Sequence, residues 1–243
     1  MREARRQLAI PEGSVPEICL LDPDGDILRH LKRSGEAARN ESWACYHTEL
    51  YDFSLGDLRL GIVGCAVGAS FAVLIAEEMF ASGCKFLISM TSSGQIMPIR
   101  KPPFFVLIEK SLRDEGTSYH YLPPSEYSEI PGEVLSILKD AFAEIPDAVE
   151  RGTTWTTDAP FRETETAIAH CRSAGILAVE MEAAALYAFS RARGKPAVCF
   201  AHVTNQMGNN EEDFEKGEEM GGPDALRVIE AAARAWLASG PGA

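Results

Sequence analysis

Two glutamates flank a methionine inside an otherwise apolar stretch that runs from Ala178 to Tyr187. Glu180 and Glu182 stand between Val179 and three consecutive alanines. Burying a carboxylate without a partner costs free energy, so we expect something polar to meet this pair. The stretch also changes from an apolar strand pattern to a helical pattern at the glutamates, which places them at a strand end.

Small polar residues follow another predicted buried strand, Lys85 to Met90. They read Thr91-Ser92-Ser93-Gly94, and they would bring backbone amides and hydroxyls to the carboxyl edge of a sheet, where ligands bind in open α/β sheets. Such a cluster can hold an anion or the oxygens of a sugar. An ordinary turn explains the same four residues equally well.

An aromatic residue stands beside two charged ones in the segment Asp158 to Thr164. Phe161, stiffened by the preceding proline, could stack on a flat heterocycle while Arg162 or Glu163 binds its edge. The alternative is a helix start capped by a side chain of this segment, with the phenylalanine buried.

The remaining pattern predicts alternating strands and helices. Expected strands are Glu17–Leu21, Trp43–Phe53, Leu58–Val63, Phe104–Ile108, Gly152–Thr157, Leu177–Val179 and Ala197–Val203. Expected helices begin near Ile27 and cover Phe71–Ser82, Gly132–Phe142, a stretch to about Arg193, and Pro223–Leu237. A glycine turn that includes Gly68 precedes the second helix, and an acidic segment, Asn209–Glu219, is expected to be a linker rather than a lid.

Composition narrows the class of partner. The 243 residues carry a net charge of −13, so nucleic-acid phosphates and anionic membranes would be repelled. No apolar run has the length of a signal peptide core or a membrane span, and we expect a cytoplasmic protein. The six cysteines lack metal-ligand spacing and are expected to be free thiols. We expect neither a metal nor a cofactor.

Taken in order, these motifs resemble those of the nucleoside phosphorylase family, which includes purine nucleoside phosphorylase, uridine phosphorylase and methylthioadenosine nucleosidase. The resemblance extends from about Ile18 to Leu237. Its most specific mark is Glu-Met-Glu-Ala-Ala, supported by Arg113-Asp114-Glu115-Gly116-Thr117-Ser118, which is similar to a turn of uridine phosphorylases. The resemblance implies one α/β domain over residues 1–243, with a central mixed sheet distorted toward a barrel and flanked by helices. Residues 1–15 would form a peripheral arm, and the protein would be a homo-oligomer: a dimer, trimer or hexamer.

The resemblance also implies roles for single residues. Met181 would bind substrate through its backbone, and the Glu182 carboxylate would accept hydrogen bonds from the ribose 2′- and 3′-hydroxyls, a task suited to an acceptor-only group. The implied substrate-binding set is Met181, Glu180, Phe161, Arg162, Glu163, Ser92, Ser93, Gly94 and Gly68. The implied catalytic set is Glu182, Asn205 and Asp24.

Asn205 corresponds to an Asp that protonates the departing base in purine-acting relatives and to Asn in some uridine phosphorylases. Asn is not a general acid, which favours a pyrimidine-like base. The Gln-x-Arg pair with which uridine phosphorylases bind uracil is missing, so the identity of the base stays open.

This sequence differs most from the family at the positions that bind phosphate in its relatives. Leu21, Gly25, Ser89 and Glu41 stand where relatives have a glycine and three arginines, although Arg29 or Arg39 could substitute. The acidic turn Asp22-Pro23-Asp24-Gly25-Asp26 would repel a phosphate dianion. Asp24 or Asp26 would instead suit a base that activates water, as in the nucleosidases, or would serve only in the turn and as a helix cap.

We therefore predict an enzyme that cleaves the N-glycosidic bond of a nucleoside, with phosphate or water as the second substrate. A non-catalytic nucleoside-binding or storage protein of the same fold is the alternative, and the retained Glu182 argues against it. A nucleotide substrate is a further possibility, which would need a basic group such as Arg100 or Lys101 for its phosphate.

Overall fold

The computed structural model describes residues 1–206 and 218–240, and within them ten strands join in one mixed sheet. The strands are β1 (Ile18–Asp22), β2 (Ala38–Arg39), β3 (Tyr51–Leu55), β4 (Leu58–Gly64), β5 (Phe86–Gln95), β6 (Phe104–Asp114), β7 (Tyr127–Glu129), β8 (Val149–Thr157), β9 (Ala178–Glu180) and β10 (Ala197–Gln206). Their order across the sheet is β10-β6-β8-β9-β5-β1-β4-β3-β2, with β7 on the edge of β6.

A five-stranded barrel closes inside this sheet because β5 pairs with β10 as well as with β9 and β1. The ring therefore runs β5-β10-β6-β8-β9 and returns to β5. The first half of β5 pairs with β1, and its last residues, Gly94 and Gln95, pair with β9. Three pairs of the ring are parallel (β5–β10, β6–β8 and β8–β9) and two are antiparallel (β6–β10 and β5–β9), so strands from distant parts of the sequence meet in it.

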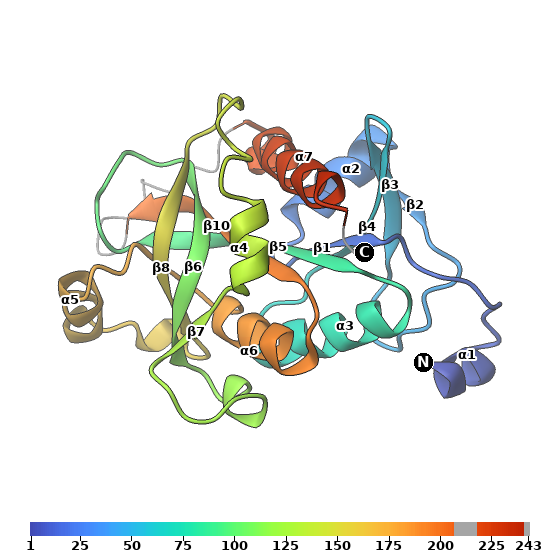
Figure 1. The fold of residues 1–243 in the computed structure, drawn as a ribbon, viewed down its shortest axis with the longest axis horizontal. Coiled ribbons are helices and arrows are strands. Elements are labelled where there is room, and N and C mark those ends of the chain that lie inside the picture. The colour runs from blue at the N-terminus through green and yellow to red at the C-terminus, as the bar shows by residue number, and fades with distance from the viewer. Residues whose placement is uncertain (207–217, 241–243) are drawn as a thin grey trace.

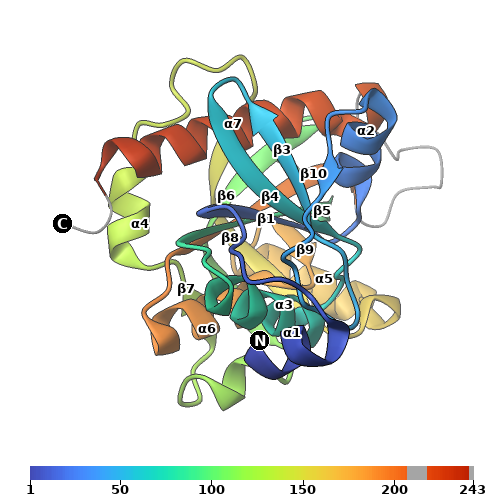
Figure 2. The same cartoon turned by 90° about the vertical axis from the view of Figure 1, so that its right-hand side faces the viewer.

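Helices cover both sides of the sheet. The two views place α2 (Asp26–Ser34) and α7 (Gly222–Ala238) on one side and α3 (Ala69–Ala81) and α6 (Ala183–Arg193) on the other (Figure 1, Figure 2). The shorter helices are α1 (Arg2–Leu8), α4 (Gly132–Ile137) and α5 (Glu165–Ser173), with 3-10 turns η1 (Ser118–His120), η2 (Pro160–Arg162) and η3 (Glu218–Gly221). None of the helices in the described ranges has the length and apolar character needed to cross a bilayer.

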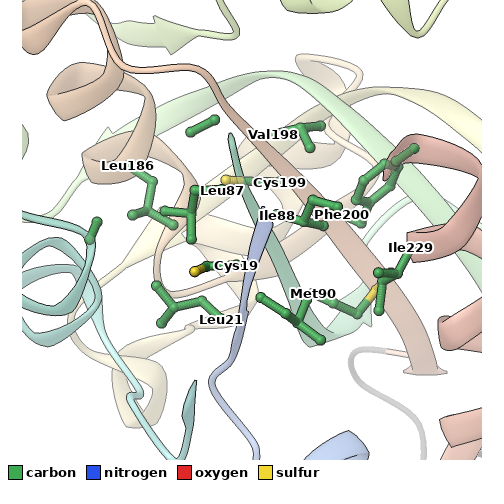
Figure 3. Packing of buried hydrophobic residues seen from close by; sticks show 14 of the residues in the cluster. Cys19, Leu21, Leu87, Ile88, Met90, Leu186, Val198, Cys199, Phe200 and Ile229 are labelled. Atoms are coloured by element: carbon green, nitrogen blue, oxygen red, sulfur yellow. The ribbon is translucent and has the colours of Figure 1, made fainter. Parts of the chain in front are cut away.

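The apolar residues predicted as buried strands form the core. Leu186 of α6 lies beside Leu87 on one face of β5, whereas Ile229 of α7 lies with Met90 and Phe200 on the other (Figure 3). Removal of such side chains from water drives the layered fold. All six cysteines are free; five are buried and Cys65 is exposed.

Most predicted elements are confirmed, with differences in extent. Trp43–Phe53 was expected to be one strand, but only Tyr51–Leu55 is extended, because the Trp43 indole donates to the Thr48 carbonyl and the chain curls there. The helix expected over Gly132–Phe142 ends at Ile137. Thr91 to Gly94 do not turn; they continue β5, since β10 pairs with them through Gly94.

Two further predictions concern the N-terminal arm and the acidic segment. Residues 2–8 of the expected N-terminal arm form a helix without buried residues, consistent with a peripheral position. The expected acidic linker falls mostly at 207–217, outside the described residues.

Candidate active site

The turn after β1 brings Asp24 to Ser92 of β5, across 68 positions of sequence. Asp24 follows β1, and its Oδ2 accepts a hydrogen bond of 2.7 Å from the backbone N–H of Ser92. β1 and β5 are parallel neighbours, with Leu21 opposite Ser89, so the residues that follow β1 lie beside the second half of β5. The sheet thus supplies a carboxylate and a donor amide to one spot.

A cavity of about 10 Å³ lies at this spot, which is room for about one water molecule. Its polar lining comprises Asp22, Asp24, Asp26, Thr91, Ser92 and His202. Apolar residues of α2, β5 and α7 and the η3 residues Met220 and Gly221 complete it. Three carboxyl groups around a water-sized space are suited to holding and deprotonating water.

Asp22, at the end of β1, is almost fully buried. Its pKa is raised to about 7, mainly by burial and also by the nearby charges of Asp24 and Asp26. Hydrogen bonds that its carboxylate accepts from the backbone N–H groups of Leu28 and Gly25 oppose this shift. The side chain therefore anchors the acidic turn and takes up a proton more readily than an exposed aspartate does.

Glu182 stands at the N-terminus of α6 and reaches the N-terminus of α3. Its Oε1 accepts a hydrogen bond of 2.7 Å from the backbone N–H of Gly68. Gly68 has φ of +93°, a conformation that L side chains rarely adopt, which explains the glycine. The pKa of Glu182 is raised to about 8, by burial first and by the charge of Glu180 second, against the opposing hydrogen bonds from Gly68 and Thr91.

Glu180 is buried and faces the protein interior. Its Oε1 accepts from the hydroxyls of Ser111, Thr154 and Thr156, at 3.1, 3.0 and 2.5 Å. Its Oε2 accepts from the backbone N–H groups of Glu182 and Ala183, both at 2.7 Å, at the start of α6. Burial raises the pKa of Glu180, and the hydrogen bonds from Thr156, Thr154 and the two backbone amides oppose that shift. The two glutamates of the motif therefore have different surroundings.

The arginines considered as ligands for phosphate form ion pairs and hydrogen bonds within the protein. Arg29 Nη2 donates to the Asp26 carboxylate at 2.5 Å and to the Asp24 carbonyl at 2.7 Å. Arg39 pairs with Glu49 on the outer strands, at 3.5 Å. Arg100, considered for a nucleotide phosphate, pairs with Glu150 at 3.3 Å. The lining of the cavity contains no arginine or lysine among the described residues.

The segment after β8 begins beside the Glu-Met-Glu motif, because Thr156 pairs with Glu180. Asp158 holds this segment by accepting from the backbone N–H of Gly116 at 3.0 Å. Phe161 is fully exposed, with a relative accessibility of 101%, and Arg162 is exposed as well. The alternative in which this ring is buried is wrong, whereas the helix cap is present: Thr164 caps α5.

Sheet register places the other predicted residues. Asn205 lies opposite Gly94, after a bulge in β10, and Gly94 lies opposite Val179 on its other side. Ser93 is buried and its hydroxyl donates to the Thr91 carbonyl at 3.4 Å. Met181 is half-buried beside Glu182. One end of the barrel thus carries Asn205, Gly94 and the glutamate motif.

Two groups of residues at the site were not predicted from the sequence. The Ser111, Thr154 and Thr156 hydroxyls that hold Glu180 come from two strands, and the run Thr153-Thr154-Trp155-Thr156-Thr157 was the available signal. His202 lines the water-sized cavity and stacks on Phe105, with ring centroids 4.6 Å apart. A single histidine in an apolar strand gave no sign of this position.

The sequence and the fold are similar to those of known proteins. A family model described as Phosphorylase superfamily matches residues 17–234. Guanosine phosphorylase of Halorubrum lacusprofundi is 24% identical over 219 residues, which are 88% of each protein. The crystal structure of uridine phosphorylase from Vibrio fischeri, complexed with 6-hydroxy-1-naphthoic acid, has a TM-score of 0.73 at 16% identity and covers 90% of each chain. The predicted fold class, a single α/β domain with a mixed barrel and flanking helices, is confirmed.

Proposed function

Because the chain belongs to the phosphorylase superfamily, we propose that it cleaves the N-glycosidic bond of a nucleoside, and that water rather than phosphate is the nucleophile. The hydrogen bond between Asp24 and Ser92 at a water-sized cavity is the observation that supports hydrolysis best. The cavity is too small for a phosphate, whose four oxygens each need about the space of a water.

Asp24 is the proposed general base. Its Oδ2 is held by the Ser92 amide, and the carboxylate lines the cavity where the water would lie. In hydrolysis the water oxygen bonds to C1′ of the sugar, one water proton passes to Asp24, and the bond between C1′ and the base breaks. The same Ser92 amide would be a natural donor to phosphate, but the protein's own carboxylate occupies it.

Glu182 is the proposed ribose ligand. Its Oε1 and Oε2 lie at the N-terminus of α6, close to the Gly68 amide and the Thr91 side chain. As a carboxylate it can accept hydrogen bonds from both vicinal hydroxyls and so fix the sugar while C1′ gains positive charge. Met181, adjacent to it, would contact the sugar through its backbone. We assign Glu180 a positioning role, since five internal donors use its carboxylate.

The base is proposed to lie between the segment after β8 and the end of β10. Phe161 would stack on it, Arg162 or Glu163 would meet its edge, and Asn205 would hydrogen-bond to it without giving up a proton. Ser92, Ser93 and Gly94 would line the path between the nucleophile and the base. We further propose that the enzyme works as a homo-oligomer.

Phosphorolysis is the second candidate, favoured by the likeness to a guanosine phosphorylase and to a uridine phosphorylase structure. It requires a cation to offset the charge of phosphate, since each guanidinium–phosphate contact contributes about 1.5–3 kcal/mol. Arg29 is the nearest candidate, and it would first have to leave Asp26 and the Asp24 carbonyl.

Product analysis on a panel of nucleosides, with and without inorganic phosphate, separates these functions. Hydrolysis predicts free base and free ribose at the same rate in both conditions. Base release that depends on phosphate and yields ribose 1-phosphate would reject hydrolysis in favour of phosphorolysis. Binding of nucleosides without release of base would indicate the non-catalytic alternative.

A further inference from the structure

The water-sized cavity is closed in part by the turn η3, which comes directly before α7. Met220 and Gly221 of this turn line the cavity together with Asp24, the proposed base. Ile27 and Met90, which also line it, are buried in the core, whereas Met220 is exposed. Met220 therefore lies between the cavity and solvent, where its side chain limits the space for a nucleophile.

Three consecutive residues of this turn have a left-handed backbone. The angle φ is +48° at Glu219, +61° at Met220 and +74° at Gly221. Residues with a Cβ rarely adopt this conformation, because the Cβ then lies too close to the following carbonyl oxygen. Such a backbone persists only where the surrounding structure imposes it. The position of Met220 at the cavity therefore depends on contacts that its neighbours make.

His30 of α2 makes these contacts. Its Nδ1 lies 2.5 Å from Oε2 of Glu219, and it donates the hydrogen bond, since a carboxylate only accepts. The ring also packs on Gly222, where a Cβ would lie 3.1 Å from Cγ of His30, closer than ordinary van der Waals contact. One side chain thus holds the chain on both sides of Met220.

The helix that carries His30 also lines the cavity. α2 begins at Asp26, and both Asp26 and Ile27 belong to the cavity lining. His30 lies one helical turn further along, on the same side of α2 as these residues. α2 therefore supplies one wall of the cavity and, through His30, fixes the wall that η3 forms.

Resting on the proposed hydrolysis, we infer that η3 is a size filter for the nucleophile. Met220 limits the cavity to about one water molecule, and the contact between His30 and Glu219 keeps Met220 in place. The filter excludes any nucleophile larger than water, whatever its charge. The carboxylates of the cavity repel phosphate by a separate means, so a neutral nucleophile is needed to test the filter.

Methanol is a suitable probe, because it exceeds water by a single methyl group. Where methanol enters, its oxygen bonds to C1′, its hydroxyl proton passes to Asp24, and the base leaves with the electron pair of the broken C1′–N bond and takes up a proton. The product is methyl riboside in place of ribose. The ratio of the two sugars in a fixed water–methanol mixture measures nucleophile selection, and a variant that is merely less stable loses rate without changing it.

Substitutions of Met220 test the wall itself. In the wild-type protein we expect almost only ribose. Met220→Ala should raise the ratio of methyl riboside to ribose about tenfold or more, whereas Met220→Leu keeps the bulk and should leave the ratio within about twofold. Leu237→Ala shortens an exposed apolar side chain near the other end of α7 and is the matched control.

Substitutions of Glu219 test the contact with His30. Glu219→Ala removes the contact and leaves Met220 unchanged, and we expect the ratio to rise about threefold or more because the wall is no longer fixed. Glu219→Gln keeps an oxygen that accepts from Nδ1 and should restore the wild-type ratio. Glu165→Ala removes a carboxylate from an exposed position on α5 and should not change the ratio.

The outcomes distinguish the filter from the proposed function. If the wild-type protein forms methyl riboside in proportion to the methanol supplied, or if Met220→Ala gives the wild-type ratio, the filter is rejected while hydrolysis stands. A wild-type ratio in Glu219→Ala would reject the role of the His30–Glu219 contact. If the wild-type protein releases no ribose from any nucleoside, the proposed hydrolysis itself fails, and the filter with it.

Discussion

The carboxylate of Asp24, in the turn after β1, accepts a hydrogen bond of 2.7 Å from the backbone N–H of Ser92 in the parallel neighbour β5. A backbone donor at this edge of an α/β sheet is a common ligand for anions. Here an internal carboxylate uses that donor and faces a cavity for one water molecule. We propose that the pair gives the site a general base at a place where an external anion could otherwise bind.

Asp24→Asn tests that base. The amide oxygen can still accept from Ser92, so the turn should keep its shape, but it cannot take a proton from water. We expect kcat to fall between about 100-fold and 10,000-fold. Asp140→Asn, at an exposed position, is the charge-matched control in the same steady-state assay. Full activity in Asp24→Asn would eliminate Asp24 as the base.

Glu182→Gln tests the ribose contact. The glutamine oxygen can still accept from the Gly68 N–H, which preserves the link between α3 and α6, but the amide nitrogen cannot accept from a ribose hydroxyl. We expect kcat/KM to fall about 100-fold or more, with an unchanged circular dichroism spectrum and melting temperature. A variant with near-normal kcat/KM would remove Glu182 from the ribose site.

The pH dependence of kcat/KM should report Glu182 in the free enzyme. Its pKa is raised to about 8, so at lower pH the group is mostly protonated and is a poorer acceptor. We therefore expect kcat/KM to rise with pH and to level off above about pH 8. A profile measured between about pH 6 and 9 that is flat or falls would contradict the role of the ionised carboxylate.

Thr156 should stabilise the fold through Glu180. Its hydroxyl donates to Glu180 at 2.5 Å and accepts from the backbone N–H of Ala184 at 2.9 Å. Thr156→Val leaves both buried groups short of a partner, and we expect the free energy of unfolding to drop by about 1–3 kcal/mol in urea titrations. Thr156→Ser should restore most of it. Thr166→Val, at an exposed position, should be nearly neutral.

Asp22 should make stability depend on pH. Its pKa is about 7 in the folded protein and near the ordinary aspartate value of 3.8 in the unfolded chain, so the folded state binds the proton more tightly. Wild-type stability should therefore fall, relative to Asp22→Asn, as pH rises from about 4 to 7, by about 4 kcal/mol at most. Unfolding free energies of both proteins at several pH values measure the difference. A constant difference would show that Asp22 does not titrate in this range.

Local patterns in the sequence were sufficient for the existence and order of most elements. The apolar run before Glu180 and the alanines after Glu182 predict a strand followed by a helix, and β9 and α6 form there. Apolar residues must face the core, so each helix or strand shows its own periodic spacing of apolar residues. This pattern can be read from a single segment. Segment ends were less predictable, as with Thr91–Gly94, because the pairing that extends β5 comes from β10, about a hundred residues later.

Sequence alone also determined that two carboxylates, an acidic turn and an asparagine occupy the ends of strands. Only the tertiary structure decided what each one faces. In the folded protein, Glu180 accepts hydrogen bonds from three hydroxyls of β6 and β8, and Asp24 accepts one from the backbone amide of Ser92. The side chain of Phe161 is exposed to solvent. The physical reason is that the hydrogen-bond partners of these side chains lie on other segments, 24 to 69 positions away in the sequence, which meet only when the sheet forms. The residues adjacent to each side chain in the sequence do not predict which distant segment it will contact.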